Sequence, residues 1–300
     1  MSASGGSNGR RTPPDAAAGR KAIPRSAEQT QGGQAAARRM TSRQVEEVIG
    51  ETGRGERLFI FLDYDGTLVR IRRTPDVATL HPARRRLLER LAGKAFVCVV
   101  SGRSLSDIRR TVGIPGLSYA GNHGLEISLH DRLWVHPRAR AIGPSLEKTV
   151  RRIEVGLSGF AGAFVERKGV TASVHYRLMA RRLVPDLKAA VGKAVGAAGG
   201  RIVLTEGKKV IELRPRFAWD KGSAVREILR RQRPGPGAVT IYIGDDRTDE
   251  DAFEALRRRA VTIRVGMRGS TAARFRLTGV DAVWRLLRAL DKAHRGPGAA

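Results

Sequence analysis

The 300-residue sequence contains a single cysteine, Cys98, so no disulfide can form within one chain. This usage fits a reducing compartment. Cys98 lies inside the apolar run 95–100, which indicates a buried strand residue rather than a nucleophile or a metal ligand. No apolar run is long enough to span a bilayer, and the N-terminal residues lack the hydrophobic centre of a signal peptide. We therefore expect a cytoplasmic protein that does not enter a membrane.

Acidic and aromatic residues are also scarce. There are 29 Asp and Glu against 56 Lys and Arg, which gives a net charge of +27, and only 5% of the residues are aromatic. This charge would attract an anionic ligand, and nucleic acid is one candidate. The arginines are nevertheless spread over many predicted helices, and no zinc-finger spacing or RNA-binding aromatic motif is present. Solvated helix faces explain the charge better, so a nucleic-acid-binding or regulatory protein is the less favoured alternative.

Large apolar residues are nearly absent from positions 1–45, which are rich in Gly, Ser, Ala, Pro and Arg. Such a segment cannot bury enough surface to offset the entropy lost on ordering. We predict a disordered basic tail over 1–45, with a short helix starting from Ser42 near its end. A transit peptide is the alternative, although glycine and proline would interrupt its amphipathic helix.

The stretch from Leu58 to Leu68 carries the first functional signal. Residues 58–62 are apolar without interruption, as in a parallel strand covered on both faces. Asp63 and Asp65 follow at the carboxyl end of this strand, where open α/β sheets bind ligands, and Gly66 permits a tight turn. We interpret Asp63 as a nucleophile that accepts a phosphoryl group and Asp65 as the acid and base that moves protons. A plain Asp-Gly turn is the alternative.

Two further chain segments place polar groups at the same edge. The run 95–100 ends in Ser101, which could bond a phosphoryl oxygen or cap the helix expected at 104–112. Lys221 precedes another helical run, where it would act as a point charge against the nucleophile and the phosphate, or simply be solvated.

A third apolar run, 239–243, is followed by five carboxylates between positions 245 and 251. These charges would repel one another without a cation, and carboxylate oxygens suit magnesium. We assign the metal role first to Asp245 and leave capping and supporting roles to be shared among the later acids, Asp246, Asp249, Glu250 and Asp251. An acid-rich first turn of the next helix is the competing interpretation, with Thr248 and Asp249 as caps.

The pattern of the chain changes between residues 125 and 214. Strands at 125–135, 163–176 and 202–213 alternate with helices at 144–157 and 184–197, and the strands alternate polar and apolar residues. This predicts an α+β domain over 125–214, inserted into an α/β core with a central parallel sheet formed by 46–124 and 215–300.

The combination of these motifs resembles the haloacid dehalogenase superfamily, through DYDGT at 63–67, Ser101, Lys221 and GDD at 244–246. Within it, the sequence is similar to the trehalose-6-phosphate phosphatase family. That similarity rests on SGR at 101–103, GNHGLE at 121–126, VERKGVTASVHYR at 165–177, GKKVIELRP at 207–215, WDKG at 219–222 and GDDRTDEDAF at 244–253. The resemblance implies a Rossmann-like core whose inserted domain is a cap that selects the substrate.

The same resemblance implies specific roles. Asp63, the Asp65 carbonyl and Asp245 would hold Mg²⁺, while Ser101 and Lys221 would hold the phosphoryl group. The residues implied in substrate binding are Arg103, Asn122, Glu166, Lys168 and Glu212. A surface ion pair is the alternative for Glu166 and Lys168.

The implied reaction is hydrolysis of trehalose 6-phosphate to trehalose and phosphate through an aspartyl phosphate, with possible functional coupling to a trehalose-phosphate synthase. The alternative substrates are other sugar phosphates, namely glucosylglycerol phosphate, mannosylglycerate phosphate and sucrose phosphate.

Overall fold

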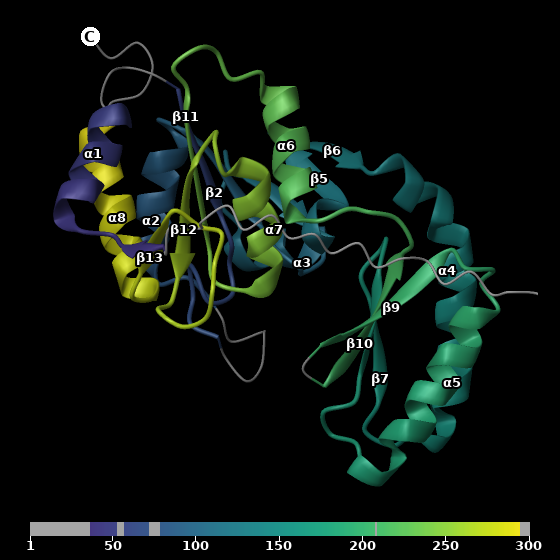
Figure 1. Cartoon of the computed structure of the whole chain (residues 1–300). Coiled ribbons are helices and arrows are strands. Elements are labelled where there is room, and N and C mark those ends of the chain that lie inside the picture. Colours follow the sequence, from purple (N-terminus) through teal and green to yellow (C-terminus); the bar gives the residue numbers. More distant parts are fainter. Residues whose placement is uncertain (1–36, 53–56, 72–78, 208, 295–300) are drawn as a thin grey trace, which may run out of the picture. The chain divides into compact units, whose positions relative to one another are not determined.

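The computed structural model describes residues 37–52, 57–71, 79–207 and 209–294. Its larger sheet has nine strands in the order β1-β13-β12-β11-β2-β3-β4-β5-β6 (Figure 1). Neighbouring strands from β1 to β4 are parallel, and β5 and β6 are added antiparallel. The strands are β1 Arg38–Arg39, β2 Leu58–Leu62, β3 Phe96–Val100, β4 Ser118–Gly121, β5 Glu126–Leu129, β6 Arg132–Val135, β11 Val239–Gly244, β12 Val261–Val265 and β13 Phe275–Leu277.

Helices cover this sheet on both faces. The helices are α1 Ser42–Thr52, α2 Pro82–Ala92, α3 Leu105–Val112, α6 Lys221–Gln232, α7 Arg247–Leu256 and α8 Val280–Ala293. Side chains of α2, α3 and α8 pack with one face of the sheet, and side chains of α6 and α7 pack with the other. The ribbon shows α8 beside α1 and α2, and α6 near α7 (Figure 1).

The alternation of side chains along β2 explains this layering. Ile60 belongs to the hydrophobic cluster on the α8 side, whereas Phe59 and Phe61 belong to the cluster on the α6 side. All five residues of the strand are buried, because successive side chains point to opposite faces and both faces are covered. The prediction of a doubly covered parallel strand at 58–62 is confirmed.

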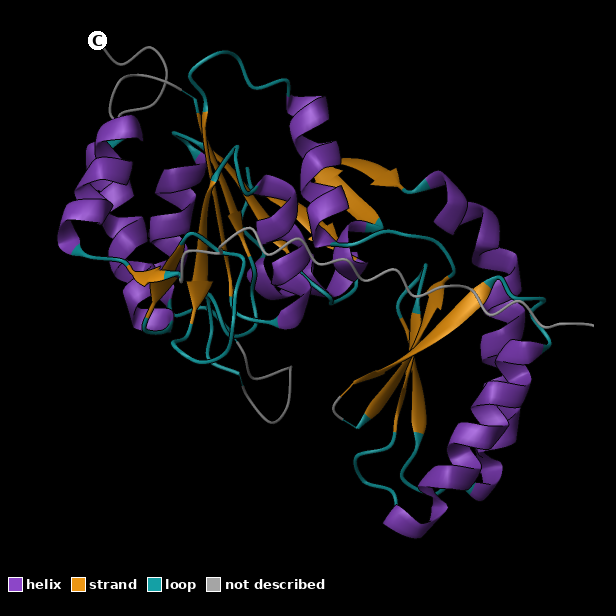
Figure 2. Cartoon of the chain, viewed as in Figure 1, coloured by secondary structure: helices purple, strands orange, loops and turns teal. Residues whose placement is uncertain are grey.

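The smaller sheet has four antiparallel strands in the order β7-β8-β10-β9. Its elements are β7 Phe164–Arg167, β8 Ala172–His175, β9 Ile202–Gly207 and β10 Val210–Pro215, with helices α4 Pro137–Gly156 and α5 Val184–Gly196. The two helices run side by side along one face of the sheet and enclose its hydrophobic cluster (Figure 2). The other face carries Glu166, Ser173 and Glu212, which are directly opposite one another on successive strands.

The structure corrects the assignment of 125–135 to the inserted domain. These residues form β5 and β6, which extend the larger sheet. A hairpin turn separates them, and His130 and Asp131 both have positive φ there, 45° and 64°. Alternation of polar and apolar residues indicates a strand with one solvated face. Such a strand fits the edge of the larger sheet as well as a separate sheet, so the pattern alone could not assign these strands.

Other boundaries also differ from the prediction. The expected strands at 163–176 and 202–213 are hairpins, β7–β8 and β9–β10, and α4 begins seven residues before Pro144, at Pro137. The predicted tail at 1–45 lies mostly outside the described residues, but its last part is ordered because β1 pairs with β13 and α1 begins at Ser42.

None of the helices in the described part of the chain is both long enough and apolar enough to cross a membrane.

Candidate active site

Three neighbouring strands bring the predicted catalytic residues together. Asp63 follows β2, Ser101 follows β3, and Asp245 follows β11, and β2 lies between the other two strands in the sheet. Lys221 starts α6 and extends to the same place, where its Nζ lies 2.8 Å from Asp63 Oδ1. Because parallel strands share one carboxyl edge, residues far apart in the sequence meet there.

Lys221 is a buried cation between two carboxylates. Its side chain is 1% exposed, and Nζ donates to Asp63 and to Asp249 Oδ1, each at 2.8 Å. Burial disfavours the ammonium form, but the charges of Asp249 and Asp63 outweigh it and raise the pKa of Lys221 well above its usual value. Lys221 therefore stays charged, and the solvated alternative is excluded by its burial.

Asp249 is the main residue of the site that the sequence interpretation left among the capping acids. Its Oδ1 also accepts from the Tyr242 hydroxyl at 2.8 Å, and its Oδ2 accepts from the backbone N–H groups of Asp245 and Asp246. Both oxygens are thus committed to donors, and the side chain is fully buried. Two features of the sequence could have indicated this role of Asp249: its position one helical turn after Asp245, and the presence of Tyr242 inside an apolar strand.

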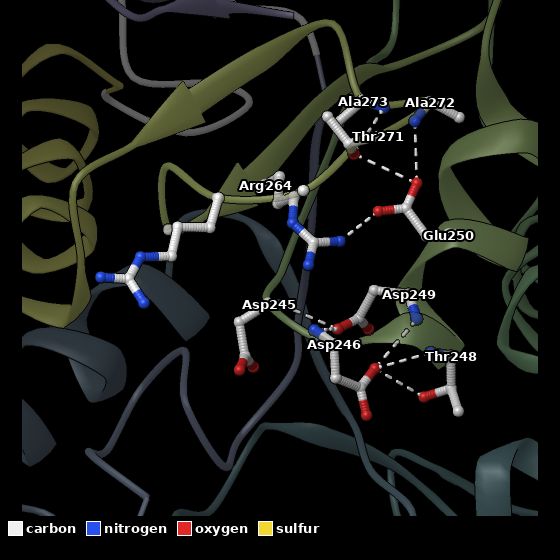
Figure 3. A network of polar contacts seen from close by, with 12 residues as sticks. Asp245, Asp246, Thr248, Asp249, Glu250, Arg264, Thr271, Ala272 and Ala273 are labelled. Atoms are coloured by element: carbon white, nitrogen blue, oxygen red, sulfur yellow. Dashed lines mark hydrogen bonds and ion pairs between the residues drawn. The ribbon is translucent and has the colours of Figure 1, made fainter.

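The remaining acids of this segment have separate structural tasks (Figure 3). Asp246 is the N-cap of α7, and its Oδ1 accepts from the backbone N–H groups of Thr248 and Asp249. Glu250 pairs with Arg264 and accepts from Thr271 Oγ1 and from the Ala272 N–H. The capping interpretation therefore holds for Asp246 and for Asp249, which completes the capping box by accepting from the Asp246 N–H, whereas Asp245 remains at the strand end.

The donor set at this edge fits a hard cation. Carboxylate oxygens of Asp63, Asp245 and Asp249 all lie within 4.8 Å of one another. Burial, followed by the charges of Asp249 and Asp246, raises the pKa of Asp245 to about 6. Burial also raises the pKa of Asp63, although Lys221 opposes this shift. Three carboxylates against one ammonium leave an excess of negative charge that a divalent cation would neutralise. Since both oxygens of Asp249 already accept hydrogen bonds, Asp63 and Asp245 are the side chains suited to ligate it.

Asp65 lies next to the nucleophile candidate but has a different partner. Arg103 donates to both of its carboxylate oxygens, from Nε and from Nη2, each at 2.7 Å. A third bond, from Arg103 Nη1, reaches Asp107, and the guanidinium lies 5.3 Å from the centre of the Tyr64 ring. This planar two-point contact fixes the orientation of the Asp65 carboxylate.

Two small residues explain the local backbone. Ser104, not Ser101, is the N-cap of α3, so the capping alternative for Ser101 is excluded. The Ser101 hydroxyl accepts from the Arg103 N–H at 3.1 Å. Gly66 has φ of 100°, and a Cβ there would lie 2.1 Å from Asp245 Oδ2, so only glycine fits this turn.

The residues expected to contact a sugar lie mostly on the smaller sheet. Glu166 Oε2 lies 2.7 Å from His175 Nε2 and 3.5 Å from Lys168 Nζ, and Glu212 lies two strands away on the same face. His175 stacks on Phe164 with ring centres 4.8 Å apart. The sequence interpretation did not include His175, whose position opposite Phe164 becomes apparent only from the strand register.

Asn122 belongs to the larger domain and contacts protein groups. Its Nδ2 donates to Glu126 Oε2 at 2.5 Å and to the Lys168 carbonyl at 2.7 Å. Its Oδ1 accepts from Thr171 Oγ1 at 2.7 Å.

A family model described as trehalose-phosphatase matches residues 61–280 of the chain. The chain belongs to the trehalose-phosphatase family. Its architecture is that of the haloacid dehalogenase superfamily, a Rossmann-like core with an α+β cap, as the sequence predicted.

Relatives of this trehalose-phosphatase family member differ in length. The trehalose-phosphate phosphatase of Mycobacterium marinum (strain ATCC BAA-535 / M) is 40% identical over 210 residues, which are 69% of this chain and 53% of the relative. An uncharacterised glycosyl hydrolase of Mycobacterium tuberculosis (strain ATCC 25618 / H37Rv) is 44% identical over 234 residues, 74% of this chain and 17% of that protein. The chain therefore spans about half the length of the curated phosphatase and a smaller share of the second relative.

A solved structure matches most of the chain. The crystal structure of a trehalose-6-phosphate phosphatase related protein is 28% identical and superposes with a TM-score of 0.68, over 78% of this chain and 97% of that chain.

Proposed function

We propose that this chain is a phosphatase that hydrolyses trehalose 6-phosphate to trehalose and phosphate in trehalose biosynthesis. The observation that carries the proposal is the buried contact of 2.8 Å between Lys221 and Asp63 at the carboxyl edge of the sheet, beside Ser101 and Asp245. The family membership of the chain supports the same reaction.

In the first step, an Asp63 oxygen forms a bond to phosphorus and the bond from phosphorus to the sugar oxygen breaks. The leaving oxygen takes the proton of the Asp65 carboxylic acid, so that trehalose departs neutral. Lys221 contacts Asp63 and favours the charged form of its carboxylate, and the same ammonium would contact the phosphoryl oxygens. The Ser101 hydroxyl provides a further donor to the same group.

In the second step, Asp65 takes a proton from a water molecule whose oxygen bonds to phosphorus. The bond between phosphorus and Asp63 breaks, which releases phosphate and restores both aspartates. Arg103 keeps the Asp65 carboxylate oriented through its two bonds of 2.7 Å. One acid therefore serves both steps, first as proton donor and then as proton acceptor.

Magnesium is the proposed cofactor, held by Asp63, the Asp65 carbonyl and Asp245. When bound, Mg²⁺ would neutralise part of the negative charge of the aspartates and the phosphate. The hard oxygen donors of Asp63 and Asp245, which lie within 4.8 Å of each other, support this choice.

Selectivity for the sugar is proposed to lie in Glu166, Lys168 and Glu212. The carboxylates of Glu166 and Glu212 lie on one face of the smaller sheet, and the Lys168 ammonium lies 3.5 Å from Glu166, so these groups offer acceptors and donors to sugar hydroxyls. Another sugar phosphate, such as glucosylglycerol phosphate or sucrose phosphate, is the alternative substrate, because the groups around Asp63 would contact only the phosphate. Coupling to a trehalose-phosphate synthase is part of the same proposal.

The experiment measures phosphate release in Mg²⁺ from trehalose 6-phosphate, glucose 6-phosphate, sucrose 6-phosphate and glucosylglycerol phosphate. We expect strong preference for trehalose 6-phosphate and a loss of about 10³-fold or more in kcat for Asp63→Asn, because the amide cannot form the phosphoryl intermediate. Asp131→Asn is the matched control, since that side chain is 86% exposed in the β5–β6 turn. Preference for another sugar phosphate would overturn the substrate but keep the nucleophile. Undiminished activity of Asp63→Asn would overturn the mechanism.

A further inference from the structure

Asn122 joins two parts of the site that the sequence separates. Its backbone N–H donates to the Arg103 carbonyl at 2.7 Å, and the next residue, His123, donates to the Ser101 carbonyl at 2.9 Å. Its side chain contacts Lys168 and Thr171 in the turn between β7 and β8. One residue thus connects the loop beside the phosphate position to the hairpin that carries the proposed sugar contacts.

The amide of Asn122 has no donor left for a ligand. Nδ2 carries two hydrogens, and one contacts Glu126 Oε2 while the other contacts the Lys168 carbonyl. Its Oδ1 accepts from Thr171 Oγ1, and the residue is 1% exposed. The backbone of Asn122 has φ of 51°, a conformation that asparagine tolerates better than most residues. This geometry suits a structural tie better than a direct sugar contact.

The turn that Asn122 holds is anchored on every side. The Lys168 N–H donates to the Thr171 carbonyl at 3.0 Å, which closes the turn. Gly169 has φ of 78°, and a Cβ there would lie 3.3 Å from Glu126 Oε1. Val170 is buried in a small cluster with Leu125, which precedes β5, and with Ala139, in the first turn of α4. The tip of the hairpin is therefore packed against the larger domain.

We propose that Asn122 is a positioning residue for sugar recognition. Through Thr171 and the Lys168 carbonyl, it fixes Lys168 and its neighbour Glu166 relative to the Ser101–Arg103 loop, so that the sugar hydroxyls and the phosphate are bound at the correct separation. The inference rests on the proposed function, because it assigns Lys168 to the sugar. It replaces the direct substrate contact that the sequence resemblance implied for Asn122.

The first test is Thr171→Val, which keeps the branched shape and removes the hydroxyl that donates to Asn122. With the sugar phosphate that the wild type prefers, we expect KM to rise about tenfold with kcat nearly unchanged, because a lost positioning contact weakens binding rather than chemistry. The kcat/KM for para-nitrophenyl phosphate, which has no sugar hydroxyls, should stay within about twofold. Thr171→Ser retains the donor and should restore the wild-type KM.

Two controls separate positioning from stability. Thr149→Val removes a buried hydroxyl that donates to the Ser145 carbonyl at 2.8 Å in α4, so it should lower Tm without changing KM. Asn122→Gly removes the amide while accepting the positive φ, and it should raise KM at least as much as Thr171→Val.

In a Lys168→Ala background, Thr171→Val should add little, because both changes remove the same contribution. Equal effects on both substrates, or full additivity with Lys168→Ala, would overturn the proposal.

Hydrogen exchange distinguishes failure of this tie from failure of the proposed function. Exchange of the Lys168 amide should become faster in Thr171→Val and remain slow in Thr149→Val. If the wild type shows no preference among sugar phosphates, the substrate proposal fails. Unchanged exchange at 168–171 in Thr171→Val would then overturn the positioning role of Asn122 as well. Faster exchange at 168–171 in Thr171→Val would still support the role of Asn122 in holding the hairpin.

Discussion

At the scale of single residues, the two proposed catalytic aspartates differ in their partners. Asp63 contacts the buried ammonium of Lys221 at one point, whereas Asp65 receives two parallel bonds from Arg103. A single contact leaves the rest of the Asp63 carboxylate for other interactions, while the planar fork of Arg103 fixes the orientation of Asp65. The arrangement thus matches a nucleophile and an oriented proton carrier.

The sequence predicted these aspartates but not the full environment of Lys221. Asp63, Ser101, Lys221 and Asp245 each follow or begin an element at the sheet edge, so the strand pattern was sufficient to predict that they lie at one edge. Asp249 lies inside the first turn of α7, where an acid is also favoured by the helix dipole. Only the structure shows that it is fully buried and bonded to Lys221 and Tyr242 rather than exposed to solvent.

Asp249→Asn tests this environment. Both oxygens of Asp249 accept hydrogen bonds, so the amide NH₂ of asparagine must face either Lys221 and Tyr242 or two backbone N–H groups. We expect a loss of about 3 kcal/mol in the free energy of unfolding, because a buried ion pair is broken and donors face one another. The shift in the midpoint of urea-induced unfolding, at an unchanged m value, measures this loss in the free energy of unfolding.

Tyr242→Phe is the matched variant for Asp249→Asn. It removes a single donor to the same oxygen and leaves Lys221 in place, so we expect a smaller loss of about 1–2 kcal/mol. If both variants cost the same, the charge of Asp249 would have no special part in holding Lys221.

At the scale of elements, the sequence was most informative where strands are covered on both faces. Continuous apolar runs located β2, β3 and β11 to within a residue at each end. Hairpins were harder, because alternation continues through a short turn and the turns at 130–131 and near Lys209 have positive φ without an Asn-Gly or Asp-Gly pair. The sheet that β5 and β6 join depends on tertiary packing, which periodicity does not encode.

Asp291 connects helix α8 to α2 and to the turn that follows α2. Its carboxylate accepts from Arg90 at 2.9 Å and from Lys94 at 3.0 Å, and its side chain is 10% exposed. Burial alone would raise the pKa of Asp291, but the bonds from Lys94 and Arg90 outweigh it and lower the pKa below its usual value. A lowered folded-state pKa means that the stabilisation is present above the unfolded pKa and is lost as the pH falls through the folded pKa.

Asp291→Asn should therefore destabilise the protein in a pH-dependent way. We expect a loss of about 1 kcal/mol at neutral pH, a small value because Arg90 is more than half exposed. The difference from wild type should shrink below about pH 4, where the carboxylate becomes protonated in the unfolded chain and then in the folded one. Thermal unfolding across this range measures it, with Asp131→Asn as an exposed control. A difference independent of pH would contradict the charge argument.

At the scale of the whole molecule, the chain combines the two sheets and their helices with a large positive charge. The family match spans residues 61–280, which includes both sheets from the end of β2 to the start of α8. The net charge of +27 is carried mainly outside residues 1–36, which contain five basic and two acidic residues. A general positive field would attract a phosphate dianion before any specific contact forms.

This field predicts salt-dependent association with the substrate. Raising the ionic strength from about 0.01 M to about 0.1 M shortens the screening length from about 30 Å to about 10 Å, so kcat/KM should fall several-fold. The turnover number kcat should remain unchanged, because the bound phosphate is screened much less than the free one. Initial rates at several salt concentrations measure both quantities.

A chain that lacks residues 1–36 is the decisive comparison. It retains most of the positive charge, so its salt dependence should match that of the full chain. The less favoured nucleic-acid hypothesis expects the opposite for binding, since it locates the contact in the basic N-terminal segment. Two results together would contradict this prediction: salt-sensitive nucleic-acid binding that is lost when residues 1–36 are removed, and a kcat/KM that does not depend on salt in either chain. The positive charge would then serve to bind a nucleic-acid partner rather than to attract the substrate.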